Sequence, residues 1–494
     1  MAAIYDQASD EAQVKVVFTT AEPDLQLPES KRQLIVPADI RRYGLSRVLN
    51  SESMLDTPSP IPFDFLVDGT YLRTTLEDYL RDNGISAETT VTLQYVRSLV
   101  PPVFEASFQH DDWVSSVDIS PSSSSHSNGR LLSGSYDGLL RLWNASGQVT
   151  TVSPGAANGG HTAGIKAARF VTATQIASAG LDRTVRIWKY GTESEEEADI
   201  DEAAAPKVLK PVLELYGHKG SVDALSVDSV SKRVLSASVD GAVGLWSVSR
   251  STAPAAPESL LPGAGAAGAS APNKKRKVAA ATSETPRRGA LALIQAHKSA
   301  ATAAVFDPRD RTVAYSAGQD HTLCTLDLTT GIVVSTVATS HSLLSLCAMR
   351  ASGSKLLAAG NSARNVVLID PRVSVATTAV MTLRGHVNKV VAVAGAPDNE
   401  YSLVSASHDG TCRIWDMRSS RKAVDDTDAA SATTSVSDAV FVIDREGREG
   451  KRRPLAGEGV KVFDVAWNKT WGIVSGGEDK QVQVNRGRDV VAAQ

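Results

Sequence analysis

One pattern recurs seven times between His110 and about Val484, and it constrains the fold more than any other feature of the chain. Each copy begins with Gly-His or a lone His and continues with an apolar strand and a strand of small residues. An Asp in a tight turn follows, and the copy ends near Trp. Repeats with these residues are typical of the blades of a β-propeller. The sequence therefore predicts a mostly β protein with a seven-bladed propeller.

The seven copies differ in how completely they carry the His, Asp and Trp of the pattern. Blade four has Leu326 in place of Trp, blade five has His341 and Ile369, and blade seven keeps only Asp479. The other sets are His110, Asp137 and Trp143; His161, Asp182 and Trp188; His218, Asp240 and Trp246; His297 and Asp320; and His386, Asp409 and Trp415. These sets are typical of WD repeats. WD-repeat propellers mostly serve as platforms for partners, so catalysis would need specific support.

Residues 13–98 predict a small α+β domain in front of the propeller. Residues 1–12 are predicted to be disordered, and Pro101-Pro102 marks the boundary to a propeller over 102–486. The expected elements are strands at Lys15–Thr20, Gln33–Pro37, Phe63–Val67 and Val91–Val96, and helices at Leu45–Asn50 and Thr75–Arg81. This order of strands and helices matches a ubiquitin-like roll.

The last repeat, Lys461–Val484, ends soon after its third strand. We expect the early strand Val103–Phe108 to supply the missing outer strand, because a closed ring has no exposed sheet edges at the point of closure. Insertions at about 192–206, 249–289 and 419–457 interrupt the repeat spacing. Their compositions cannot bury a core, so they are predicted to be disordered.

Composition excludes several classes of function. The net charge of −4 does not favour nucleic-acid binding by bulk charge. Cys324, Cys347 and Cys412 lie far apart and form neither a metal-ligand spacing nor a disulfide framework. No apolar run approaches a membrane span, and no secretory signal is visible. We therefore expect no intrinsic metal site, no resident cofactor and no membrane partner.

Four consecutive cations, Lys274, Lys275, Arg276 and Lys277, lie in the second insertion. A basic cluster on an extended segment suits the acidic groove of a nuclear-import receptor. We interpret it as an import signal that Arg287-Arg288 would extend; the alternative is an ordinary solvated charge run.

Ser, His and Asp recur together in the repeats, and such a set would suit a hydrolase triad. One active site does not need several copies, so we interpret the sets as structural hydrogen-bond networks that tie each turn to Trp. Trp415–Arg418 also fits a loose Trp-Asp-x-Arg pattern with which some propellers dock a cullin-ligase adaptor. An ordinary blade end is the interpretation that we favour.

Glu88 lies just before the last predicted strand of the N-terminal domain. It is either a solvated charge or a carboxylate that completes the coordination shell of a divalent cation held by a partner. The residues alone leave both interpretations open.

Several segments together carry a resemblance to a known family. They are Arg42–Ser46, Pro62–Val67, Leu72–Thr74 with Asp78–Leu80, Asp112–Ser116, Ser133–Gly138, Ser362–Asn365 and Asp370–Arg372. They closely resemble the eukaryotic ribosome-biogenesis WD-repeat proteins with a notchless-like (NLE) N-terminal domain that partner pescadillo and the block-of-proliferation protein. The resemblance covers roughly residues 13–486.

The resemblance implies a non-enzymatic assembly factor for the large (60S) ribosomal subunit and its pre-rRNA processing, in the nucleolus and nucleoplasm. It implies a heterotrimer in which the propeller docks the block-of-proliferation propeller and pescadillo is the third member. The ubiquitin-like domain would be gripped by the MIDAS domain of the AAA ATPase midasin for release from pre-60S particles. Glu88 would then be a ligand of the MIDAS cation, and Mg²⁺ is the expected ion because it prefers carboxylate oxygen.

A second family with the same N-terminal domain is an alternative. The notchless protein shares the N-terminal domain and the midasin mechanism, but it resembles an eight-bladed propeller, whereas seven repeats are counted here. Direct rRNA contact through Lys451-Arg452-Arg453 or the basic insertion is left open, as are the propeller residues that contact the partner.

Overall fold

The computed structural model describes residues 12–57, 60–86, 88–120, 129–191, 206–261, 285–349, 355–372, 379–422, 435–446 and 460–487. The chain divides into two compact units. One comprises Met1–Val100 with Met417–Thr427, and the other Pro101–Asp416 with Asp428–Gln494. Among the helices in the described ranges, none has the length and apolar character that a membrane span requires.

The N-terminal unit is a five-stranded mixed sheet with two helices. Its elements are β1 (Gln13–Thr19), η1 (Pro23–Leu25), η2 (Glu29–Lys31), β2 (Gln33–Pro37), α1 (Arg42–Leu49), β3 (Phe63–Val67), β4 (Thr70–Tyr71), α2 (Leu76–Asp82) and β5 (Val91–Arg97). The strand order is β2-β1-β5-β3-β4, and β1 pairs in parallel with β5. A first strand parallel to the last strand, with two helices between them in sequence, is the arrangement of a ubiquitin-like roll, as the sequence predicted.

Alternating residues of the strands build the core of this unit. Phe18, Phe65 and Tyr95 are at most 1% exposed, and the rings of Phe18 and Tyr95 meet edge to face with centroids 6.2 Å apart. Leu45 of α1 and Leu76 of α2 are fully buried in the same cluster. Both helices therefore stabilise the sheet by burying leucines against its apolar side chains.

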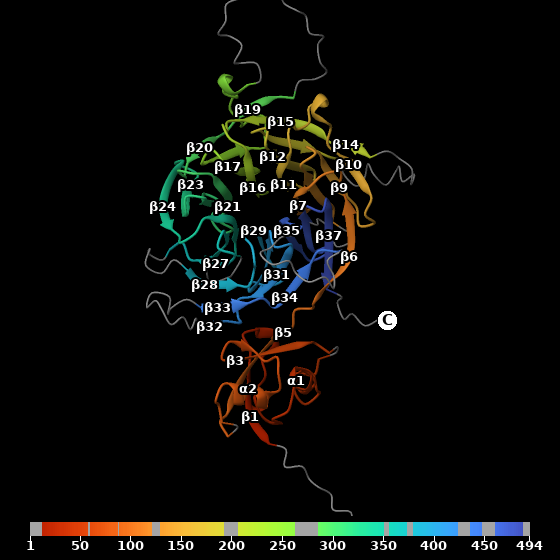
Figure 1. Cartoon of the computed structure of the whole chain (residues 1–494), viewed down its shortest axis with the longest axis vertical. Coiled ribbons are helices and arrows are strands. Elements are labelled where there is room, and N and C mark those ends of the chain that lie inside the picture. The colour runs from red at the N-terminus through yellow and green to blue at the C-terminus, as the bar shows by residue number, and fades with distance from the viewer. Residues whose placement is uncertain are drawn as a thin grey trace, which may run out of the picture. The chain divides into compact units, whose positions relative to one another are not determined.

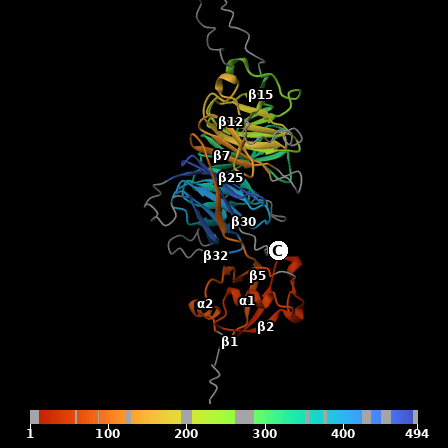
Figure 2. The ribbon, with the colours of Figure 1, turned by 90° about the vertical axis from the view of Figure 1, so that its right-hand side faces the viewer.

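The second unit contains seven sheets of the propeller type, arranged around a common centre (Figure 1). Blade one consists of β7 (Val114–Ile119), β8 (Leu131–Ser135), β9 (Leu140–Trp143) and β10 (Val149–Val152); blade two of β11 (Ile165–Thr172), β12 (Gln175–Gly180), β13 (Val185–Lys189) and β15 (Lys210–Tyr216); blade three of β16 (Val222–Asp228), β17 (Arg233–Ser238), β18 (Ala242–Ser247) and β20 (Ala292–Gln295); blade four of β21 (Ala301–Phe306), β22 (Val313–Gly318), β23 (Thr322–Asp327) and β24 (Ile332–Ala338); blade five of β25 (Leu343–Ala348), β26 (Leu357–Asn361), β27 (Val366–Ile369) and β28 (Ala379–Arg384); blade six of β29 (Val390–Gly395), β30 (Ser402–Ser407), β31 (Thr411–Asp416) and β34 (Phe441–Asp444); and blade seven of β35 (Val462–Asn468), β36 (Gly472–Gly477), β37 (Gln481–Gly487) and β6 (Pro102–Gln109). Figure 2 shows the same sheets after a quarter turn.

The ring closes through its inner and its outer strands. Each first strand packs against the first strand of the next blade, and β35 packs against β7. The early strand β6 pairs antiparallel with β37, which confirms the predicted closure. At the joint, Asp464 accepts hydrogen bonds from the Ser116 hydroxyl at 3.1 Å and the Val117 N–H at 3.0 Å, and its carboxylate lies 3.0 Å from the Arg169 guanidinium. This carboxylate joins blades seven, one and two.

Two of the predicted disordered insertions contain ordered elements, so their predicted bounds are wrong. Residues 249–289 include η5 (Glu258–Leu260) and β19 (Arg287–Gly289), and residues 419–457 include β32 (Arg421–Lys422), β33 (Ser435–Asp438) and β34. Blade six has only three strands by Asp416, and β34 supplies the fourth. Short strands within low-complexity sequence form because a neighbouring strand provides their hydrogen bonds, which no local pattern reveals.

Candidate functional site

The predicted His, Asp and Trp of blade two lie in one buried network. His161 contacts the Asp182 carboxylate through Nδ1 at 2.7 Å and the Ser178 hydroxyl through Nε2 at 2.7 Å. The Trp188 indole N–H donates to the same hydroxyl at 2.7 Å. The network therefore ties the segment before the first strand to the turn between the second and third strands and to the third strand itself.

The same geometry recurs in blades three and six. His218 lies 3.2 Å from Asp240 and 2.7 Å from Ser236, which also accepts from Trp246 at 2.7 Å. In blade six, the corresponding distances among His386, Asp409, Ser405 and Trp415 are 2.9, 2.7 and 2.8 Å. Blade four keeps the His297 contacts to Asp320 and Ser316, at 3.1 and 2.9 Å, without the tryptophan.

Burial sets the protonation of these networks. Burial lowers the pKa of His161 and His386 despite their carboxylate partners. Burial also opposes ionisation of Asp182, but hydrogen bonds from His161 and Thr184 outweigh it and lower the pKa of Asp182 to about 2. The chemistry is thus a neutral imidazole that bridges a carboxylate and a hydroxyl.

These sets cannot act as hydrolase triads in this arrangement. The side chains of His161, His218 and His386 are 0% exposed, and Ser178, Ser236 and Ser405 are 0% exposed. A nucleophilic serine must reach its substrate, whereas each of these hydroxyls is occupied by an indole N–H and an imidazole. The geometry is that of hydrogen-bond networks that cross-link the strands and the turn within one blade.

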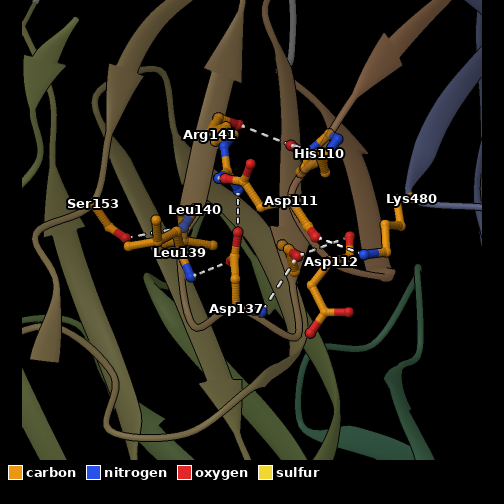
Figure 3. Close-up of polar contacts among 12 residues, drawn as sticks. His110, Asp111, Asp112, Asp137, Leu139, Leu140, Arg141, Ser153 and Lys480 are labelled. Carbon is orange, nitrogen blue, oxygen red and sulfur yellow. Dashed lines mark hydrogen bonds and ion pairs between the residues drawn. The ribbon is translucent and has the colours of Figure 1, made fainter.

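Blade one carries a rearranged network (Figure 3). His110 donates from Nδ1 to the Phe108 carbonyl at 3.2 Å and contacts the Ser133 hydroxyl at 2.8 Å. The turn aspartate, Asp137, pairs with Arg141 instead of the histidine. The Arg141 guanidinium donates to Asp137 and to Asp111, at 2.7 Å each. Burial, reinforced by the Arg141 charge, lowers the pKa of His110 to about 4.

Blade seven replaces the missing histidine with an arginine that the sequence pattern did not reveal. Arg445 is 2% exposed and donates from Nη1 to the Ser475 hydroxyl at 2.8 Å and from Nε to Asp479 at 2.8 Å. It enters from the segment after β34, outside the repeat spacing. The sequence indicated a missing partner only through Asp479, which has no histidine in its repeat although a buried carboxylate needs a hydrogen-bond partner.

The turns that carry the aspartates lie on one face of the ring together with the starts of the first strands. In blade one this follows from the pairing of Val114 with Ser135, which places the start of β7 beside the end of β8. We call this surface the turn face. The residue before the aspartate is Tyr136, Leu181 or Val239 in blades one to three, and Leu181 and Val239 are 44% and 47% exposed. The turn face therefore presents apolar side chains over three consecutive blades.

An aromatic cluster continues this apolar surface across the joint between blades six, seven and one. Trp113, 38% exposed, lies against Tyr136 and Phe463 with ring centroids 5.7 and 5.9 Å away. The ring of His408 meets Phe463 edge to face at 5.6 Å. The Lys166 ammonium lies 5.3 Å from the centre of the Tyr136 ring and donates to its hydroxyl at 2.9 Å. Aromatic side chains held in place beside a cation are typical of the centre of a protein–protein interface.

Sequence reasoning did not single out the turn face as a site. Trp113 and Tyr136 lie in segments that carry the family resemblance, whereas no sequence pattern indicates Phe463 or His408. The available signal was the apolar residue that precedes the turn aspartate in several repeats, since that position points away from the blade core.

Glu88 lies in the loop between α2 and β5 of the N-terminal unit and is exposed. Its carboxylate makes no hydrogen bond or ion pair with the described residues. The Thr89 N–H donates to the Ser86 carbonyl at 3.1 Å, which closes a turn beside Glu88. In the part of the chain that the structure covers, no group of three or more His, Cys, Asp or Glu could hold a metal ion.

Other predicted residues lie outside the described ranges or serve the fold. Lys274, Lys275, Arg276 and Lys277 fall outside the described residues, as do Lys451-Arg452-Arg453. Arg287 and Arg288, expected to extend the import signal, lie in β19, which pairs with β15. The Arg287 guanidinium is 3.4 Å from the Glu214 carboxylate. These two arginines are therefore part of a propeller sheet.

The Trp-Asp-x-Arg segment has the geometry of a blade end. Trp415 and Asp416 are 0% exposed and lie in β31. A buried Trp and Asp stabilise the blade and are not available to an adaptor.

The fold and the buried blade sets define a WD-repeat scaffold with a ubiquitin-like domain. A family model for the NLE (NUC135) domain matches residues 14–80, and the model for the WD domain, G-beta repeat, matches residues 103–144, 153–189, 209–247 and 377–416. The solved WD40 β-propeller domain of Doa1 covers 80% of this chain at a TM-score of 0.52 and 16% identity, with all of that domain matched. This likeness supports the propeller fold alone.

Relatives of nearly equal length give the family. The chain is 60% identical to "Ribosome biogenesis protein YTM1" of Podospora anserina over 491 residues, 97% of this chain and 98% of the relative. It is 60% identical to the Chaetomium thermophilum protein of that name, with 99% of each chain covered, and 50% identical to the Aspergillus fumigatus protein, with 97% and 96% covered. The chain belongs to the YTM1 family of ribosome biogenesis proteins, and it is a WD-repeat ribosome biogenesis factor.

Proposed function

We propose that this protein is a non-enzymatic assembly factor for the 60S ribosomal subunit and its pre-rRNA processing, and that its turn face docks a partner protein. The aromatic cluster of Trp113, Tyr136, Phe463 and His408 is the observation that carries this proposal. A half-exposed aromatic group surrounded by other rings can bury a large apolar area on binding without losing much side-chain entropy.

The partner that the family resemblance suggests for this face is the block-of-proliferation WD-repeat protein, with pescadillo as the third member of the complex. The apolar arc of Tyr136, Leu181 and Val239 supports a broad protein surface rather than a small ligand. The acidic Asp111 side chain, 84% exposed in the segment before β7, would contribute to specificity at the rim.

The ubiquitin-like domain is proposed to be the handle that the MIDAS domain of midasin grips when it releases the complex from pre-60S particles. The exposed Glu88 carboxylate supports this role, because it can offer oxygen to a divalent cation held by midasin. The cation, Mg²⁺ by this chemistry, would be shared at that interface only, and the chain would need no cofactor of its own.

The proposal includes action in the nucleus, in the nucleolus and nucleoplasm, with entry through an import receptor that binds Lys274–Lys277. The alternatives gain no support from the described residues. The YTM1 relatives do not favour a notchless-type factor, and the burial of Trp415 and Asp416 argues against a cullin-ligase receptor. Direct rRNA contact is not part of the proposal.

The test is binding of the full-length chain to the purified block-of-proliferation propeller by calorimetry. Trp113→Ala is expected to weaken binding by about 2 kcal/mol or more, as for a hot-spot aromatic. Val230→Lys, at a loop position that is 64% exposed in blade three, is the matched surface control and should bind as the parent does. Equal affinity of the parent and Trp113→Ala would refute docking through the turn face.

A further inference from the structure

The outer strands of several blades share one irregularity. In blades one, two, four, five and seven, a single residue of the outer strand is bulged out of the ladder with the third strand. These residues are Thr150, Val212, Val334, Val380 and Glu105. The bulge gives these five outer strands a common reference position.

In three of these five blades the chain adds a further strand outside the bulged one. β14 (Lys207–Val208) pairs with β10, β19 with β15, and β33 with β28. All three pairings are parallel, and all lie within four residues after the bulge. The outer edge of this propeller therefore accepts an added strand at a fixed position and in a fixed direction.

The position two residues after the bulge provides the hydrogen bonds to the added strand. In blade two the N–H of Glu214 donates to the Pro286 carbonyl at 3.0 Å, and in blade one the carbonyl of Val152 accepts from the Leu209 N–H at 2.9 Å. The corresponding residue of blade four is Thr336.

The backbone of blade four is oriented in the same way. Thr339 N–H donates to the His321 carbonyl at 2.7 Å, which makes their pairing a hydrogen-bonded one. Hydrogen-bonded and non-hydrogen-bonded pairs alternate in an antiparallel ladder. Thr336 and Ala338 therefore direct their N–H and C=O groups away from β23. Within the described residues, β24 is the last strand of its sheet.

β24 also lacks the features that usually protect a sheet edge. The strand Ile332–Ala338 contains no charge and no proline, and Ile332 and Val334 are 61% and 67% exposed. The other uncovered outer strands are protected: β6 contains Pro102 and Glu105, and β20 and β34 have four residues each. A seven-residue, uncharged and β-branched edge is suited to strand addition.

We propose that the edge of β24 over Ser335–Ala338 is a docking site for an extended peptide segment of a partner protein, which adds as a fifth strand parallel to β24. The partner segment is uncharged at the positions that pair with β24. At two of the three edges that the chain covers itself, opposite charges face each other: Glu214 faces Arg287, and Arg384 faces Asp438. The corresponding residues of β24 are the neutral Thr336 and Ala338.

The occupant is a different chain segment rather than a second copy of β24. Two copies of one strand that pair about a two-fold axis run antiparallel. The three strands that this propeller adds to itself are parallel. This site lies on the outer rim of blade four and is separate from the turn face, so it does not depend on the proposed function.

The test uses the full-length chain and a capped peptide, Ser-Val-Thr-Val-Ser-Val, as a neutral probe. Fluorescence polarisation of the labelled peptide should show saturable binding, and amide hydrogen exchange should slow at Thr336 and Ala338 in its presence. Thr336→Pro removes the outward N–H without removing a bond to β23, and it is expected to weaken binding about tenfold or more. Val334→Lys is a second variant that places a charge at the edge.

Val230→Lys is the control for added charge and should bind the peptide as the parent does. A nitroxide at the N-terminus of the peptide should broaden resonances near Ile332, and one at the C-terminus resonances near Ala338. Unchanged exchange at Thr336 at millimolar peptide, or equal affinity in the parent and both β24 variants, would overturn the proposal. The proposal would also be overturned, in favour of a second copy, if the chain self-associates through antiparallel β24 strands and Val334→Lys abolishes that self-association.

Discussion

The guanidinium of Arg445 holds Asp479 in blade seven at the place where other blades use histidine. It donates to the Asp479 carboxylate from Nε at 2.8 Å and to the Ser475 hydroxyl from Nη1 at 2.8 Å. Its side chain is 3% exposed, and that of Asp479 is 18% exposed. One buried cation thus satisfies the turn aspartate and the second-strand serine together, and blade seven keeps its cross-link without the usual residues.

Replacing Arg445 with methionine should destabilise the propeller. The substitution leaves a largely buried carboxylate without its cation, which typically costs about 3–5 kcal/mol. The measurement is urea unfolding followed by tryptophan fluorescence. The matched control is Arg486→Met, because Arg486 pairs with Glu105 in the same blade at 3.0 Å but both side chains are nearly half exposed. That variant should change the free energy of unfolding by less than about 1 kcal/mol. Equal effects of the two variants would contradict the assigned role of Arg445.

In blade six, Ser405→Ala should be costly although it removes a single oxygen atom. The Ser405 hydroxyl accepts from the Trp415 indole at 2.8 Å and contacts His386 at 2.7 Å. Its loss leaves a buried N–H without an acceptor, and the expected cost is about 1–3 kcal/mol. Ser146→Ala, at an exposed loop position, is the control. A double-mutant cycle with Trp415→Phe should show coupling, and additive effects would mean that the two groups do not act as one network.

The sequence predicted the blades well because their signal is local and repeated. The sets around His161, His218 and His386 recur at nearly constant spacing, so each copy supports the others. The early strand β6 could be predicted because blade seven lacked a partner strand. In contrast, Arg445 reaches Asp479 from a segment outside the repeat, and β33 and β34 lie within low-complexity sequence. Their positions depend on strands that offer free hydrogen-bonding groups, which is a tertiary property.

The turn-face cluster shows a different limit of sequence reasoning. Trp113, Tyr136, Phe463 and His408 come from three blades and meet only when the ring closes. No spacing along the chain relates them, so the site could not be predicted before the blades were placed around the ring.

Stability should fall as the pH decreases from about 6.5 toward 4. Burial, followed by the Arg141 charge, lowers the pKa of His110 to about 4, and burial, followed by Lys389 and Lys461, lowers the pKa of His408 to about 4. Because both folded-state values lie below the ordinary value of about 6.5, the unfolded chain binds more protons in this window. The contribution of these two histidines to the free energy of unfolding is therefore fully present above pH 6.5. The ionised Asp182, with a pKa of about 2, also stabilises the folded chain in this window, and its contribution is lost only as the pH falls from about 3.8 toward 2.

Urea midpoints at pH 7.5, 6 and 5 would measure this dependence. The buried His110 alone is expected to contribute on the order of 3 kcal/mol over the whole window. His110→Asn should show a flatter dependence, because it removes one of the buried histidines whose pKa is lowered. A parent midpoint that stays constant between pH 7.5 and 5 would contradict the burial of these imidazoles in their neutral form.

Glu88 offers the sharpest test of the proposed handle. Full-length chain should bind a midasin MIDAS fragment in the presence of Mg²⁺, and EDTA should abolish the binding because the cation bridges the two proteins. Glu88→Gln keeps the shape of the side chain but removes the anionic oxygen that Mg²⁺ prefers. It is expected to weaken binding at least about tenfold, while Glu29→Gln, another exposed acid of the same domain, should have no effect. Mg²⁺-dependent binding that is equal in parent and Glu88→Gln would keep the handle but assign the metal ligand elsewhere. Parent protein that binds equally well in Mg²⁺ and in EDTA would exclude a bridging cation altogether.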